Sequence, residues 1–305
     1  MKNTSLPAFF YPLAAMLFWG MSFVWTSILL KYYEPISIIL VRLILSVGFL
    51  FLLMAIRGKI EKLYKKDIFL ILLSAIFNPF LYFLGENYGL KFSSSTIAAV
   101  IIATIPVFAP IAGYVTYREK LSWINIAGIL VSFAGVLVML MTGDFKLSVE
   151  PKGVIFLFGA VFAALCYSIM LKKLSVTYSP LTIVGYQNLA GIFFFLPFFF
   201  IFEVKKFITV APNMEIVRSF LFLAILCSSL AYVFYAKSVQ LFGIAKSNIF
   251  TNLIPVFTAI FSFMILSEEF TVQKVIGMII VVGGVYVSEM NRKAKYEVRS
   301  TKYEE

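Results

Sequence analysis

Arg42 and Glu86 are ionisable side chains that stand inside stretches of sequence that are otherwise apolar. If these stretches are helices, Arg42 lies roughly 10 Å from the start of its helix, and Glu86 lies at a similar depth. A charge in an apolar environment is costly unless it is paired or hydrated, so we expect the two to pair. The pair has two interpretations. It ties two helices together, or it has a function in which Glu86 carries a proton or Arg42 holds a substrate carboxylate.

Two prolines occupy the middle of apolar stretches. Pro106 and Pro255 lack the N–H that would bond the carbonyl four residues earlier, so the carbonyls of Ile102 and Thr251 are expected to be free at mid-membrane depth. Each proline either kinks a helix that a neighbour bridges or marks a break that lines a cavity. Their recurrence at equivalent depth favours the cavity.

Uncharged polar side chains also occur inside the apolar stretches, and Asn78-Pro79 predicts a third break. In lipid such amides more often join helices than bind a ligand, and both interpretations stay open. Together with Arg42, Pro106 and Pro255, the residues expected at a substrate cavity are Trp19, Ser22, Asn78, Gln187, Asn248 and Asn252.

Several chemistries lack their residues here. The sequence contains no histidine, which removes imidazole metal ligands, Ser-His and Cys-His nucleophile pairs and histidine proton relays. Apart from Glu86 the acids are scattered in loops, so an enzyme is not expected. Neither Gly58-Lys59 nor residues 243–247 have the spacing of a phosphate-binding loop. We therefore expect no metal, no cofactor and no nucleotide-driven step.

The composition defines the elements that must position these residues. The 305-residue chain is 61% hydrophobic and 13% charged, with a mean hydropathy of +0.96, which indicates an integral membrane protein. Only helices are plausible spanning segments, because backbone amides in lipid must bond within their own segment. Ten apolar stretches have the length of a membrane span, at residues 8–31, 35–56, 68–90, 93–117, 121–141, 153–171, 180–202, 216–237, 243–266 and 272–289.

The basic residues indicate topology. The net charge of +11 falls in short runs between apolar stretches, so nucleic acid is not an expected partner. With both termini inside, inner segments hold 17 of the 26 Lys and Arg residues, outer segments hold eight, and Arg42 lies within a helix. This bias predicts cytoplasmic termini in a multi-pass protein of the cell membrane.

The chain also repeats itself. Residues 105–138 match residues 254–287 at ten of 34 positions, beginning with Ile-Pro-Val-Phe in both halves. Glycines at 128, 135, 277 and 284 recur every seven residues within this match, which predicts close helix packing. Five helices per half is an odd number, so the second half must be inverted in the membrane, the plan of many secondary transporters. We expect one repeat at 1–145, a second at 146–290 and a charged cytoplasmic tail at 291–305.

From about residue 10 to 290, the chain resembles the EamA family of the drug/metabolite transporter superfamily. The resemblance rests on Phe18-Trp19-Gly20, Arg42, Pro106 followed by Glu119, and their echo in Pro255 and Glu268. It implies export or exchange of small metabolites, such as amino acids and their derivatives, through a central cavity between the halves. The second half departs where Gln187 replaces Arg42 and Ala164 replaces Trp19, so any substrate-holding charge is expected to be asymmetric.

A flippase for lipids or lipid-linked metabolites is the alternative. It uses related architecture, but it would show an apolar side opening with one basic headgroup site, whereas a metabolite transporter would show an enclosed polar cavity. The expected partners are a small-molecule substrate and membrane lipids, and a homodimer is left open.

Overall fold

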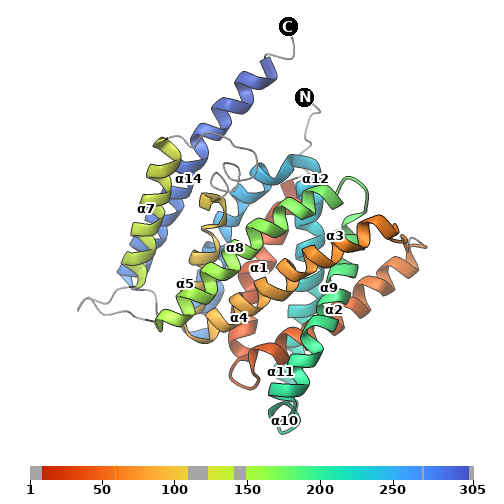
Figure 1. The fold of residues 1–305 in the computed structure, drawn as a ribbon. Coiled ribbons are helices and arrows are strands. Elements are labelled where there is room, and N and C mark those ends of the chain that lie inside the picture. The colour runs from red at the N-terminus through yellow and green to blue at the C-terminus, as the bar shows by residue number, and fades with distance from the viewer. Residues whose placement is uncertain (1–8, 59, 109–122, 141–148, 270, 302–305) are drawn as a thin grey trace.

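The computed structural model describes residues 9–58, 60–108, 123–140, 149–269 and 271–301, and within these ranges every regular element is helical. The predicted all-α class is therefore confirmed. Figure 1 shows the arrangement of the helices. The first part of the chain forms α1 (Phe10–Leu29), α2 (Pro35–Ile56), α3 (Lys65–Ala75), π-helix η2 (Ile76–Leu81), α4 (Tyr82–Lys91), α5 (Ser95–Ile102) and α7 (Trp123–Leu140). The remainder forms α8 (Pro151–Leu174), α9 (Pro180–Phe198), η3 (Phe199–Glu203), α10 (Val204–Phe207), α11 (Met214–Phe222), η4 (Leu223–Leu230), α12 (Ala231–Ile249), η5 (Phe250–Leu253), α13 (Ile254–Phe261), η6 (Ser262–Leu266) and α14 (Val272–Thr301).

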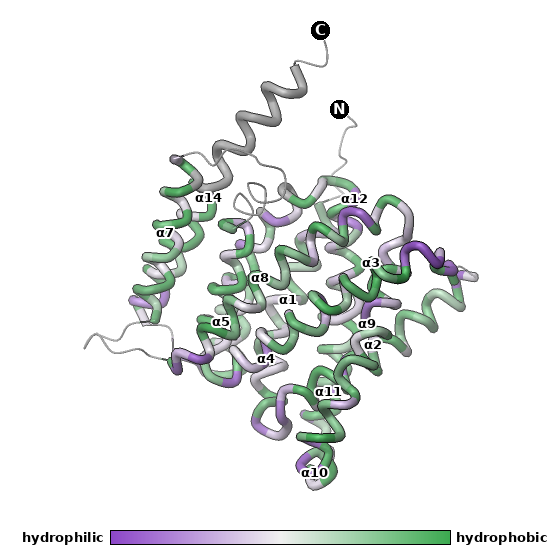
Figure 2. Tube along the Cα trace, in the orientation of Figure 1, coloured by the Kyte–Doolittle hydropathy of each residue, from purple (hydrophilic) through white to green (hydrophobic). Residues whose placement is uncertain are grey.

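The apolar stretches of the sequence become membrane-length helices. Figure 2 shows apolar residues along most of the helices and polar residues gathered at helix ends and connections. Within the described residues, six helices are long and apolar enough to cross a membrane, at Phe10–Leu29, Pro35–Ile56, Lys65–Lys91, Pro151–Leu174, Pro180–Phe207 and Met214–Ile244. Four shorter apolar helices lie at Ser95–Phe108, Ile126–Leu140, Phe250–Leu266 and Val272–Val287. Each of the ten predicted stretches overlaps one of these helices.

The predicted boundary between stretches 216–237 and 243–266 falls inside α12. Gly243 has φ +79° and ψ 169° there, which interrupts the helical geometry. Side chains with a Cβ rarely adopt such a φ, whereas glycine does so readily. The sequence therefore places a glycine where α12 changes direction before it leads into η5.

α2 and α9 are packed neighbours, and each has its N-terminus capped by an acid that follows the other helix. Glu203 is 4% exposed and accepts hydrogen bonds from the backbone N–H of Ile36 (3.2 Å) and Ser37 (2.6 Å) at the start of α2. Glu61 accepts one from the N–H of Ser179 (3.1 Å), just before α9. The first N–H groups of a helix have no partner within it, and a carboxylate satisfies them. These crossed caps require α2 and α9 to run in opposite directions.

α1 and α8, the first helices of the two halves, each pack against two helices of the opposite half. α1 packs against α12 and α13, and α8 packs against α4 and α5. In sequence order α1 opens the first half of the chain and α8 opens the second. Each therefore packs mainly on helices of the opposite half, so the two halves are interleaved and do not form separate domains.

α7 and α14 pack along each other on one side of the molecule (Figure 1). A Cβ added to Gly277 would lie 2.2 Å from Cγ of Met139, and one added to Gly284 would lie 2.5 Å from the backbone N of Ser132. A Cβ on Gly135 would lie 2.7 Å from the backbone N of Val281. Only glycine permits these approaches, which confirms the predicted close packing.

We expect Gly284→Ala to lower the thermal stability of the purified protein in detergent. Its methyl group meets the backbone of Ser132, which cannot move without separating α7 from α14, and overpacking of this kind costs about 1–3 kcal/mol. Gly283→Ala is the matched control, because a Cβ there meets nothing within 4 Å. Melting temperatures followed by tryptophan fluorescence should differ between the two variants, and equal values would contradict the packing argument.

Candidate functional site

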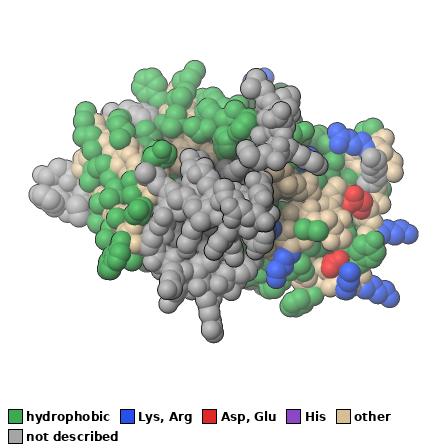
Figure 3. Space-filling model, turned by 90° about the horizontal axis from the view of Figure 1, so that it is seen from above, with side chains coloured by type: hydrophobic (Ala, Val, Ile, Leu, Met, Phe, Trp, Pro, Cys, Tyr) green, Lys and Arg blue, Asp and Glu red, His purple; other side chains and the backbone are tan. Residues whose placement is uncertain are grey.

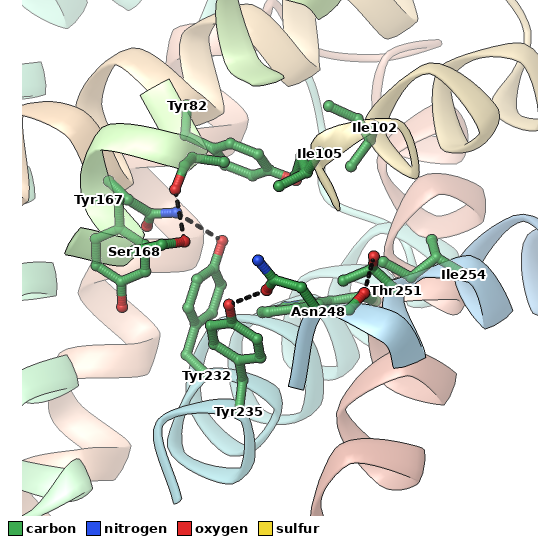
Figure 4. Close-up of a pocket in the computed structure, with 13 residues that line it drawn as sticks. Tyr82, Ile102, Ile105, Tyr167, Ser168, Tyr232, Tyr235, Asn248, Thr251 and Ile254 are labelled. Carbon is green, nitrogen blue, oxygen red and sulfur yellow. Dashed lines mark hydrogen bonds between the residues drawn. The ribbon is translucent and has the colours of Figure 1, made fainter. Parts of the chain in front are cut away.

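A cavity lies where α1, η2, α4, α8 and α12 meet the helix breaks at α5 and α13 (Figure 4). Its volume of about 40 Å³ has room for a few water molecules. Among the described residues that line it, no side chain is charged and five carry aromatic rings. The lining residues are Trp19, Asn78, Tyr82, Ile102, Ile105, Ala164, Tyr167, Ser168, Tyr232, Tyr235, Asn248, Thr251 and Ile254.

The first helix break borders this cavity at Pro106. α5 ends at Ile102, and helical geometry resumes at Ile105. The hydroxyl of Thr104 donates to the carbonyl of Ile101 (2.6 Å) within the break. Pro106 thus stands in the first turn of a new helical segment, where its missing N–H is tolerated. Of the two interpretations that the sequence leaves open for Pro106, the structure therefore shows the break and not a kink within one continuous helix.

The second break repeats this geometry at Pro255. The 3₁₀ turn η5 separates α12 from α13, and Pro255 stands in the first turn of α13. The hydroxyl of Thr251 donates to the carbonyl of Asn248 (2.6 Å), as Thr104 does to Ile101 in the first half. The prolines themselves are buried and are not among the lining residues, but residues beside each break face the cavity.

Two N–H donors at the cavity have no hydrogen-bond partner among the residues that the structure describes. They are Nε1 of Trp19 and Nδ2 of Asn248, and both atoms are buried. The Asn248 side chain is fixed because its Oδ1 accepts a hydrogen bond from Tyr235 (2.5 Å). The Trp19 ring is held by an edge contact with Tyr232 and a tilted contact with Tyr235, with ring centroids 4.9 and 5.1 Å apart. Buried donors are rarely left unpaired, so these two are suited to an acceptor on a bound solute.

Asn78 lies at the break predicted in the third apolar stretch. It has φ −146° and ψ 118° inside η2, followed by a cis bond to Pro79, so the expected interruption is present. Its Nδ2 donates to the hydroxyl of Tyr232 (3.1 Å) at the cavity wall. Asn78 therefore both lines the cavity and joins η2 to α12.

Arg42 and Glu86 lie together, as the sequence predicts. Nη1 of Arg42 is 3.8 Å from Oε2 of Glu86, and the two side chains are 1% and 7% exposed. Nε of Arg42 donates to Ser228 (2.7 Å), and the guanidinium lies 4.1 Å from the ring centroid of Phe83. Oε1 of Glu86 accepts from the hydroxyl of Tyr82 (3.1 Å). Neither charged residue lines the cavity, but Tyr82 does.

Other polar residues singled out in the sequence join helices. Nε2 of Gln187 donates to Ser74 (2.8 Å), which links α9 to α3, and Tyr167 at the cavity donates to Gln187 Oε1 (3.4 Å). The hydroxyl of Ser22 donates to the carbonyl of Trp19 (2.6 Å). Oδ1 of Asn252 is buried and has no hydrogen-bond partner in the described part of the chain. In contrast to the expectation, Gln187, Ser22 and Asn252 are not among the residues that line the cavity. For Ser22 and Gln187 the reason is that the apolar residues of α1 and α9 follow no clear helical period, so the sequence does not fix which face turns inward.

Four tyrosines that the sequence did not single out supply most of the aromatic wall, namely Tyr82, Tyr167, Tyr232 and Tyr235. A tyrosine near the centre of an apolar stretch needs a partner for its hydroxyl, which was the available signal. Glu119, which corresponds to Glu268 in the sequence repeat, lies outside the described residues. Glu268 forms an ion pair with Lys274 (3.3 Å) away from the cavity lining.

The sequence of this chain was compared with known protein families. A model of the EamA-like transporter family matches residues 6–141 and again residues 151–290. The chain belongs to the EamA-like transporter family. It is accordingly a multi-pass membrane transporter of the drug/metabolite transporter superfamily.

Relatives of this EamA-family chain are also transporters by name. The uncharacterized transporter YetK of Bacillus subtilis (strain 168) is 30% identical over 254 residues, which cover 82% of this chain and 77% of YetK. An uncharacterized transporter of Archaeoglobus fulgidus is 28% identical over 275 residues, 90% of this chain and 94% of the relative. A crystal structure at 15% identity superposes with a TM-score of 0.65 over 90% of this chain and 98% of the other, which shows a shared fold.

The contacts of Arg42 predict how the EamA-family protein responds to loss of either charge. Glu86→Gln leaves the guanidinium buried without a counter-charge, and breaking a buried pair typically costs about 3–5 kcal/mol. Arg42→Met is expected to cost less, because the stranded carboxyl group can take up a proton whereas arginine hardly gives one up.

The double variant Arg42→Met with Glu86→Gln should recover much of the lost stability. The measurements are yield of monodisperse protein and melting temperature in detergent for wild type, both single variants and the double variant. Strictly additive losses would mean that the two side chains do not interact.

Proposed function

We propose that the protein is a secondary transporter that exports or exchanges small metabolites, such as amino acids or their derivatives, across the cytoplasmic membrane. The observation that supports this most is the cavity with unpaired donors at Trp19 and Asn248. A solute with oxygen acceptors and a partly apolar body would pair these donors and cover the aromatic wall. Its substrate-contacting residues would be Trp19, Asn78 and Asn248, and Gln187 would act through Tyr167.

The transporter is proposed to consist of ten helices in two inverted repeats, at 1–145 and 146–290, with a tail at 291–305. Three observations support this division. The family model matches the chain twice, once in each half. The crossed caps make α2 and α9, the second helices of the halves, antiparallel. The neighbours of α1 in the second half correspond to those of α8 in the first.

Alternating access would move the halves against each other around the cavity. A cavity of about 40 Å³ is too small for an amino acid, so a substrate requires such a movement. At one end of α2, Glu34 binds Lys91 and Lys206. Partial burial opposes ionisation of Glu34, but hydrogen bonds from both lysines outweigh it and lower the pKa of the carboxyl group. At the start of α9, Tyr178 donates to Asp67 (2.8 Å). Opening toward one side of the membrane would break the ion pairs of Glu34, and opening toward the other would break the hydrogen bond between Tyr178 and Asp67.

Glu86 is the proposed proton carrier of the cycle, because it is a buried carboxylate of a membrane helix. It is joined to the cavity wall by the hydrogen bond that it accepts from Tyr82. Arg42 would then stabilise its ionised form. The flippase alternative fits less well, since none of the described residues that line the cavity is basic and the guanidinium of Arg42 is already engaged by Ser228 and Glu86.

Transport of a metabolite panel, led by amino acids, into liposomes that contain the purified protein tests this proposal. We expect uptake of at least one solute and acceleration of its exchange by an excess of the same solute on the other side. Lipid scrambling without solute flux would favour the flippase. If the protein shows neither solute flux nor lipid scrambling, the proposed transport of this substrate class is contradicted.

Trp19→Phe should weaken the apparent affinity for that solute about two- to twelvefold, because an aromatic ring is kept and one hydrogen bond worth about 0.5–1.5 kcal/mol is lost. Trp25→Phe is the matched control on the same helix, because Trp25 stacks on Phe222 (4.8 Å) outside the cavity lining. The measurement is the concentration dependence of uptake. Equal effects of the two substitutions would remove Trp19 from the site.

The orientation is proposed from the charge bias. Figure 3 views the molecule from the side at which α14 ends, and Lys and Arg side chains gather at one end of this face. We propose that this face is cytoplasmic. In a Cys166→Ala/Cys227→Ala background, Lys62→Cys and a reporter after Lys302 should react only from the cytoplasmic side. Lys152→Cys, 54% exposed in wild type, should react from outside, and the reverse pattern would invert the topology.

A further inference from the structure

Glu86 is separated from the cavity, and a proton carrier at that position needs a route to water. Its carboxyl group is buried, and Glu86 is not a lining residue. Tyr82 stands one helical turn earlier on α4 and belongs to both environments. Its side chain lines the cavity, and its hydroxyl donates to Oε1 of Glu86 (3.1 Å).

We propose that Tyr82 is the proton relay between the cavity and Glu86, an inference that rests on the proposed function. A protonated water in the cavity gives its proton to Oη of Tyr82 while the phenolic hydrogen passes to Oε1 of Glu86. One O–H bond breaks on water and one on the phenol, and one forms on the phenol and one on the carboxylate. Tyr82 begins and ends neutral, so no charge is stored on the ring.

The groups around Glu86 leave this route as the direct one to the cavity. Arg42 on α2 faces Oε2, on the side of the carboxyl group away from the bond to Tyr82. Within the part of the chain that the structure describes, Cys227 on η4 and Tyr232 on α12 are the other titratable groups near the carboxylate. The hydroxyl of Tyr232 accepts from Asn78, and the thiol of Cys227 donates to the carbonyl of Phe18. Of these groups, only Tyr82 both reaches the cavity and has a hydrogen bond to Glu86.

Proton uptake by Glu86 would also change the hold on Arg42. The carboxylate and Nη1 are 3.8 Å apart and share no hydrogen bond, so their attraction depends on charge alone. A neutral Glu86 releases the guanidinium toward its remaining contacts, Ser228 on η4 and the Phe83 ring. Because Ser228 belongs to the second half, protonation of Glu86 through Tyr82 would change contacts across the interface between the halves.

The test uses the full-length protein in liposomes and compares two rates for one transported solute, its exchange at equal pH and its accumulation driven by a pH gradient. Tyr82→Phe keeps the ring and removes the hydroxyl, so we expect the ratio of pH-driven accumulation to exchange to fall at least tenfold. Tyr232→Phe removes a cavity hydroxyl that has no bond to Glu86, and its ratio should equal that of wild type. A pH-sensitive dye inside the liposomes reports the accompanying proton flux.

Each outcome decides the proposal. An unchanged ratio in Tyr82→Phe overturns the relay. If the ratio is unchanged because both rates fall equally in monodisperse protein, Tyr82 is a structural residue. If wild type exchanges solute without any response to pH, the relay fails while the proposed transport stands. If wild type exchanges no solute, the proposed function itself fails.

A second variant covers the case in which Tyr82→Phe does not fold. Tyr82→3-fluorotyrosine keeps the ring and the hydroxyl but makes the phenol more acidic. A relay predicts that the pH profile of the pH-driven rate shifts while the profile of exchange does not. Coincident profiles for the fluorinated protein and wild type in both assays overturn the relay.

Discussion

A polar group inside the hydrocarbon layer must find its partner within the protein, and this constraint governs the structure. The free N–H groups at the start of α2 would be costly in lipid, and Glu203 from the far end of α9 satisfies them. Glu61 does the same for the start of α9. Each cap comes from the other half of the chain. The requirement for backbone hydrogen bonds therefore also fixes the antiparallel pairing of α2 and α9, and through it the arrangement around which the other helices pack.

The same constraint explains why the cavity lies at the helix breaks. Irregular backbone at membrane depth is tolerated where it is buried in protein or borders a hydrated space. Threonine hydroxyls at 104 and 251 bond carbonyls beside the breaks, and prolines at 106 and 255 begin the next helical segments without needing an N–H donor. The remaining space is lined by tyrosines, whose hydroxyl groups need partners and whose rings tolerate an apolar environment.

The sequence was sufficient for features that have few solutions and insufficient for those that depend on helix rotation. An arginine and one glutamate at similar depth in apolar helices leave little choice but to pair. Glycines every seven residues predict close helix packing, and the structure shows which helices they join, α7 and α14. The inward face of α1 or α9 is different, because both helices are apolar all round and their periodicity is weak. Ser22 and Gln187 were therefore placed at the cavity, whereas their side chains bond Trp19 and Ser74. The capping acids at 61 and 203 were missed because their partners are about 118 and 167 residues away in sequence.

The asymmetry between the halves locates the ionisable chemistry. Arg42 on α2 and Gln187 on α9 occupy equivalent positions in the sequence repeat, and each donates to a serine on a helix of the opposite half, Ser228 and Ser74. The hydrogen bond across the halves is thus kept in both copies, while the charge is present in one. A tie between helices needs only the hydrogen bond, and glutamine supplies it at a lower desolvation cost than arginine. The guanidinium and its carboxylate in the first half therefore exceed what a tie between helices requires, which is why we propose that any charge-dependent step lies on the α2 and α4 side of the cavity.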